Sequence, residues 1–127
     1  MICYRVHGDT DGETHVTPVE IPVSETPVGT VRGMGDIPTT TVGVAEFVGC
    51  RKPDTGMHEP PRRAFIVVLG GELEIVTSLG QQTRLRAGDF LLADDMGTKG
   101  HISRDVGEVP LTMMTIGIGS DWEAPGV

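Results

Sequence analysis

Cysteine is scarce in this sequence of 127 residues, which has only Cys3 and Cys50. Neither belongs to a CxxC pair or to another spacing typical of thiolate ligands. This excludes a disulfide framework and a cysteine-rich metal site. We expect both thiols to be reduced, rather than joined as a Cys3–Cys50 bridge, in a protein located in the cytoplasm.

Cationic side chains are also few. Ten Lys and Arg residues stand against 18 Asp and Glu residues, which gives a net charge of −8 and an isoelectric point near 4.8. Nucleic-acid binding depends on clustered Lys and Arg, so a nucleic-acid partner is not expected. No apolar run approaches the length of a signal-peptide core or a membrane span, so we expect no membrane partner either.

Glycine and proline are plentiful, with 18 Gly and 9 Pro recurring between short apolar runs. These recurring turn-forming residues, together with the lack of amphipathic helical periodicity, predict an all-β fold that closes as a sandwich or barrel. The length fits one domain with a continuous core. Strands are predicted at 3–6, 16–19, 41–48, 64–69, 72–77, 82–85, 90–93, 101–104 and 111–118.

Two segments carry further structural predictions. The strands 64–69 and 72–77 flank Gly70-Gly71, a spacing that predicts a β-hairpin with a two-residue turn. The segment Ile21–Thr40 is rich in Pro, Thr and Gly, and is either an extended arm over the barrel or a neighbour, or a loose surface loop.

Two motifs carry a family resemblance. The stretch 57–75 reads MHEPPRRAFIVVLGGELEI, and it is followed by GDFLL at 88–92 and GHISR at 100–104. This arrangement resembles the two-part signature of cupins. In that family the first part supplies two His and one Glu, the second supplies another His, and the four hold a divalent metal inside a small β-barrel.

The match is strongest at the glycines. Gly71 fits the closing Gly of the first motif, and His58 then stands at its first His. Pro60 and Ala64 occupy the places of the second His and the Glu. In the second motif His101 resembles the ligand, so two of the four family ligands are retained.

The order of elements resembles a bacterial subgroup of small single-domain cupins. This resemblance implies a cupin-type double-stranded β-helix, or jelly-roll barrel, with an extended N-terminal arm. It implies that residues 1–127 form one cupin domain, with strands and arm at 1–40, the barrel core at 41–118 and a tail at 119–127. It also implies a homodimer formed through the sheet edge and the arm, for which an unpaired edge strand gives a physical motive.

The histidines support two kinds of chemistry. A tight metal site needs at least three protein ligands, and His58 and His101 supply two. A third would have to come from elsewhere in the chain, and the candidates are His7, His15, Glu46 and Asp94. The expected cofactor is therefore none, or one weakly held divalent metal such as Zn, Fe, Mn or Ni.

Without metal, two imidazoles facing one cavity can act as general acid and base, because their unperturbed pKa lies near 6.5. This suits a lyase, isomerase or cyclase acting on a small organic molecule, with specialised metabolism as the expected setting. Two alternatives stay open: a metal-dependent cupin oxygenase or decarboxylase, and a non-catalytic cupin that binds a small molecule.

Charged residues near the motifs are candidates for binding a substrate. Arg62 and Arg63 suit a carboxylate or phosphate, but adjacent strand residues face opposite sides, so only one can point inward. Lys99 and Glu46 are further candidates. An apolar lining, which would suit a largely apolar molecule, is predicted from Phe65, Val67, Leu69, Leu73, Ile75, Leu91, Met113 and Met114.

Overall fold

The structure is a computed structural model that describes residues 1–48 and 56–126. These residues form eleven β-strands and contain no helix, so none of the described segments is a helix that could cross a membrane. The all-β prediction is confirmed. The strands are β1 (Cys3–Gly8), β2 (Thr14–Pro18), β3 (Val23–Thr26), β4 (Gly29–Arg32), β5 (Thr39–Glu46), β6 (Ala64–Gly70), β7 (Glu72–Thr77), β8 (Gln82–Arg86), β9 (Phe90–Asp94), β10 (His101–Val106) and β11 (Thr112–Ile118).

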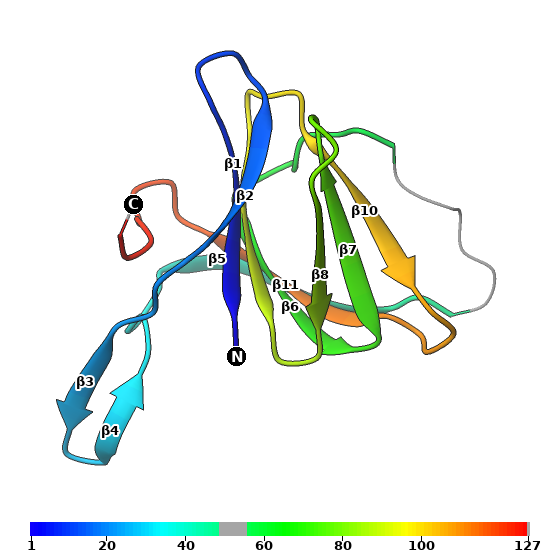
Figure 1. Ribbon diagram of the computed structural model, residues 1–127. Coiled ribbons are helices and arrows are strands. Elements are labelled where there is room, and N and C mark those ends of the chain that lie inside the picture. The colour runs from blue at the N-terminus through cyan, green and yellow to red at the C-terminus, as the bar shows by residue number, and fades with distance from the viewer. Residues whose placement is uncertain (49–55, 127) are drawn as a thin grey trace.

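Two sheets enclose the main core (Figure 1). A six-stranded sheet has the order β2-β1-β9-β6-β11-β5, and a three-stranded sheet has the order β10-β7-β8. Apolar side chains from both sheets meet between them. This barrel-like core includes Val6, Val68, Leu73, Ile75, Leu85, Leu91 and Leu111, all of which are buried.

The six-stranded sheet is covered on both faces. Leu91 packs in the main core, whereas its neighbour Leu92 packs in a second cluster on the opposite face with Phe65 and the C-terminal Ala124. Because successive strand residues point to opposite faces, a strand buried on both sides carries a continuous apolar run. This explains the unbroken Phe90–Ala93 stretch in the sequence.

The predicted hairpin between β6 and β7 is wrong, although both strands exist. The neighbours of β6 are β9 and β11, so it has no free edge for β7, which pairs with β8 and β10 instead. Gly71 turns the chain from one sheet to the other with φ of 72°. A Cβ at Gly71 would lie 2.7 Å from the Pro110 carbonyl oxygen, so the corner is tight as well as left-handed.

The segment Ile21–Thr40 contains a third, separate sheet. Here β3 and β4 pair with each other and project from the rest of the molecule (Figure 1). Next comes β5, which is exposed along its length and lies at the edge of the six-stranded sheet.

Cys3 is a buried free thiol, and burial raises its pKa to about 11. Cys50 lies outside the described residues, so the state expected for that thiol stays a prediction.

Candidate functional site

His58 and His101 lie directly opposite each other in a short antiparallel bridge. The His58 N–H donates to the His101 carbonyl oxygen at 3.0 Å, and the His101 N–H donates to the His58 carbonyl oxygen at 2.9 Å. Directly opposed residues of an antiparallel pair project to the same face. The two imidazole rings accordingly lie 5.0 Å apart, centroid to centroid, at an interplanar angle of 50°.

Asp95 lies behind His101 and fixes its ring. The Nδ1 of His101 is 2.5 Å from the Asp95 Oδ2, and both side chains are almost fully buried. A carboxylate only accepts, so the Nδ1 carries the hydrogen and the Nε2 is left as the basic nitrogen. The other oxygen of Asp95, Oδ1, is buried without a hydrogen-bond partner in the described part of the chain. Within the described residues, the hydrogen bond to this carboxylate therefore comes from His101.

His58 is oriented in a similar way by a different acceptor. Its Nδ1 lies 3.0 Å from the Gly56 carbonyl oxygen. Because a carbonyl also only accepts, this contact places the hydrogen on Nδ1 in neutral His58. Both rings are thus held in defined tautomers, one by a carboxylate and one by a peptide carbonyl.

Both imidazoles line a cavity of about 970 Å³ in the barrel-like core. The segment from His58 to Ile66 contributes His58, Pro60, Pro61, Arg62, Ala64 and Ile66 to its wall. Within β6, Ala64 and Ile66 line the cavity and Phe65 between them does not, because strand side chains alternate. Ser103, Thr41 and Thr115 add hydroxyl groups to the wall. The apolar lining consists of Val42, Phe47, Pro60, Pro61, Ala64, Ile66, Leu73, Ala93, Leu111 and Met113.

This lining corrects part of the sequence prediction. Leu73 and Met113 line the cavity as predicted. Phe65 does not, because the register of β6 turns Ala64 and Ile66 inward and packs Phe65 against Trp122 on the other face. Leu69 is 47% exposed. A shift of one residue along a strand exchanges its inward and outward sets.

The side chains of the adjacent Arg62 and Arg63 point to different sides, as predicted for neighbouring residues. Arg62 lines the cavity, and its Nη1 donates to the Thr41 Oγ1 at 3.0 Å. Arg63 points away and forms an ion pair with Asp94, with 2.9 Å between its Nε and Oδ1. It also donates to the carbonyl oxygens of Gly119 and Trp122. Arg63 therefore anchors the C-terminal segment and is left out of the site.

Lys99 and Glu46 also lie away from the described cavity wall. The Lys99 ammonium forms an ion pair with Glu13 and lowers the pKa of that carboxyl through their hydrogen bond. Glu46 ends β5, where its carboxylate accepts a long hydrogen bond of 3.5 Å from Thr112. Neither residue is brought to the histidines.

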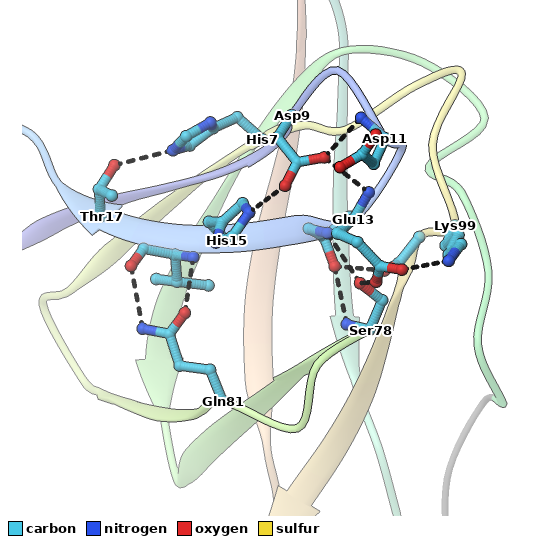
Figure 2. Close-up of polar contacts among 12 residues, drawn as sticks. His7, Asp9, Asp11, Glu13, His15, Thr17, Ser78, Gln81 and Lys99 are labelled. Carbon is cyan, nitrogen blue, oxygen red and sulfur yellow. Dashed lines mark hydrogen bonds and ion pairs between the residues drawn. The ribbon is translucent and has the colours of Figure 1, made fainter.

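The turn between β1 and β2 supports the loop 95–100, which carries Asp95 and leads to His101. The buried Thr14 hydroxyl donates to the Gly100 carbonyl oxygen at 2.8 Å and accepts from the Ser78 N–H at 2.8 Å. Glu13 accepts from the Ser78 hydroxyl and pairs with Lys99 (Figure 2). The β1–β2 turn, the end of β7 and the loop 95–100 are thus joined directly beside His101.

The remaining candidate metal ligands have other partners. His15 bonds to Asp9 at 2.7 Å, and His7 bonds to the Thr17 hydroxyl at 3.2 Å (Figure 2). Burial, Arg5 and His15 lower the pKa of His7. Asp94 is paired with Arg5 and Arg63. None of these side chains lies on the described wall of the cavity.

A resident metal does not fit the described donor set. Within residues 1–48 and 56–126, no group of three or more His, Cys, Asp or Glu side chains is placed to hold an ion. Two imidazoles supply half of a four-coordinate set.

Comparison with known proteins gives no assignment, because no family model and no curated protein matches this chain.

Proposed function

We propose that this protein is a cupin-type jelly-roll enzyme that transforms a small organic molecule by acid–base chemistry, as a lyase, isomerase or cyclase. One observation carries the proposal: a buried Asp95–His101 pair stands beside His58 at the wall of a largely apolar cavity. The two motifs and the all-β, two-sheet architecture support the cupin assignment.

The two histidines have different roles in this proposal. His101 is the base, because the Asp95 carboxylate stabilises the imidazolium that forms when its Nε2 accepts a proton. His58 is the acid, because its ring lies 5.0 Å from that of His101 and lines the same cavity, so its imidazolium form can deliver a proton to a second atom of the same substrate.

A minimal step follows from these roles. The Nε2 of His101 takes a proton from a carbon next to a substrate carbonyl, and the electron pair of the broken C–H bond moves toward the carbonyl oxygen. That oxygen takes a proton from His58, which gives a neutral enol. Return of the proton to another face or another carbon isomerises the substrate, and departure of a β-substituent makes the reaction an elimination.

The test does not require the natural substrate to be identified. We would incubate the protein in D₂O with a panel of amphipathic ketones and keto acids, and follow loss of the α-proton signals by NMR. Deuterium exchange should be catalysed by the native protein and fall about 100-fold or more in His101→Ala. Exchange that is absent in the native protein, or unchanged in both His58→Ala and His101→Ala, would overturn the proposal.

Two other proposals follow from the family resemblance. The protein forms a homodimer, since β5 is an exposed edge strand with Val42 and Val44 63% and 66% exposed. Small-angle scattering should give about twice the mass of 13.5 kDa, and the mass of one chain would refute the dimer.

The binding-only alternative predicts that a bound metabolite is released unchanged, with no exchange at any carbon.

A further inference from the structure

The charge of the cavity wall is opposite to that of the whole chain. The sequence has a net charge of −8. Among the described residues that line the cavity, none is Asp or Glu, and Arg62 is the one permanently charged side chain. The two imidazoles are neutral or positive. The Asp95 carboxylate is buried behind His101 and bonded to it, so the charge on the described wall itself comes from Arg62 and favours a ligand that carries negative charge.

Arg62 is placed to receive an anion. Its aliphatic chain approaches β11 at Gly117, where the Arg62 Cδ lies 3.3 Å from the position that a Cβ would occupy. The exposed Thr41 hydroxyl accepts from one of its five N–H donors, which orients the head group where the cavity meets solvent. The planar guanidinium matches a carboxylate, with which it can form two parallel hydrogen bonds.

The rest of the wall defines the other part of the ligand. The aromatic ring of Phe47 and the side chains of Ile66, Leu111 and Met113 suit an apolar body. Met113 adds an adaptable surface, because its unbranched side chain has several rotatable bonds. Arg62, the one permanently charged side chain among the described lining residues, compensates one negative charge.

We infer that the cavity binds an amphipathic monoanion, a carboxylic acid with an apolar body, whose carboxylate pairs with Arg62. This deepens the proposed function and rests on it in one respect, namely that the same cavity holds the substrate. In that setting Arg62 selects and orients the acid, while the histidines act on another part of it. Arg62 is thus a specificity residue and not one of the acid–base pair.

The experiment compares two probes of nearly the same shape. 1-Naphthaleneacetate carries a carboxylate at neutral pH, and 1-naphthaleneacetamide replaces it with a neutral amide. Their dissociation constants for the full chain would be measured by titration calorimetry at low and moderate ionic strength. The acid should bind about tenfold more tightly than the amide, and added salt should reduce this preference.

Variants locate the preference. Arg62→Met should weaken binding of the acid about tenfold and leave binding of the amide unchanged, while Arg62→Lys should restore part of the loss. Arg86→Met is the matched control, because Arg86 is an exposed arginine paired with Glu72, away from the described cavity wall. Unfolding curves of all variants would establish that they fold.

The outcomes separate ligand class from catalysis. Equal affinity for the two probes, no binding of either, or equal weakening of both in Arg62→Met would overturn the inferred ligand class. These results would not bear on the acid–base role of the histidines. That role is tested separately by deuterium exchange, which does not require a carboxylate. A clear preference for the acid without any exchange would instead refute the catalytic proposal and leave a binding module for amphipathic acids.

Discussion

Gly100 packs so closely against the backbone of His58 that a Cβ at Gly100 would lie 2.2 Å from the His58 carbonyl oxygen. Its φ is 79°, in the left-handed region that favours glycine. The glycine directly before His101 therefore lets the two histidine segments approach and exchange their backbone hydrogen bonds. The pairing of the two imidazoles depends on a residue that has no side chain.

Gly100→Ala should consequently separate the two histidines. We expect the free energy of unfolding to fall by roughly 2–5 kcal/mol, from left-handed backbone strain together with displacement of the His58 segment. Gly97→Ala is the control in the same loop, since Gly97 has φ of 75° and no neighbouring atom within 4 Å of the place that a Cβ would take. It should lose only about 1–2 kcal/mol. Urea unfolding would measure both, and equal losses would contradict the close-contact argument.

The strands are predictable because their signal is local. Glycine, proline and short apolar runs place the ends of nine of the eleven described strands within one or two residues of those observed. The other two, β3 and β4, lie in the segment Ile21–Thr40, for which the sequence predicts an arm or a loop. Pairing is not predictable in the same way. The turn at Gly70-Gly71 has the composition of a hairpin turn, yet β6 already has two neighbours, and no local pattern reveals that competition.

The site is predictable in part for the same reason. Alternation along a strand predicts that only one of Arg62 and Arg63 points inward, and the structure places Arg62 at the cavity and Arg63 in an ion pair with Asp94. The role of Asp95 escapes sequence reasoning because its contact with His101 needs the loop 95–100 to fold back, which depends on Gly97, Gly100 and their positive φ. A signal is present in the acidic pair Asp94-Asp95 shortly before His101, although the sequence alone points to Asp94 as the ligand candidate.

Asp95→Asn should impair the proposed chemistry without unfolding the protein. The amide is nearly the same size, but it cannot compensate an imidazolium and can donate to the ring, which favours the wrong tautomer. We expect catalysed deuterium exchange to fall about 100-fold. The far-downfield proton resonance expected from a 2.5 Å His101–Asp95 hydrogen bond should also vanish. If Asp95→Asn kept both the exchange rate and the downfield resonance, the role of Asp95 would be limited to packing.

Two contacts stabilise the loop 95–100: the buried hydrogen bonds of Thr14 and the exposed ion pair of Lys99. We expect them to contribute differently to the free energy of unfolding. Thr14→Val removes a buried hydroxyl and leaves the Gly100 carbonyl and the Ser78 N–H without it, so the free energy of unfolding should drop by about 1–3 kcal/mol. Lys99→Met removes an ion pair whose ammonium is exposed to solvent, where screening makes such pairs weak. Thermal and urea unfolding should show little change for Lys99→Met, and a loss as large as that of Thr14→Val would contradict this ranking.

Metal content decides between the acid–base proposal and its metal-dependent alternative. The Nδ1 contacts of His58 and His101 would also suit metal ligands, because ligating imidazoles commonly donate their other nitrogen to a carboxylate or a carbonyl. Two such ligands without a third among the described residues hold a divalent ion weakly, so freshly purified protein should contain far less than one equivalent of Zn, Fe, Mn or Ni by mass spectrometry. Dialysis against a chelator should leave deuterium exchange unchanged. About one metal per chain, lost in both His58→Ala and His101→Ala, would instead favour the oxygenase or decarboxylase alternative and would require a further ligand beyond the side chains identified in 1–48 and 56–126.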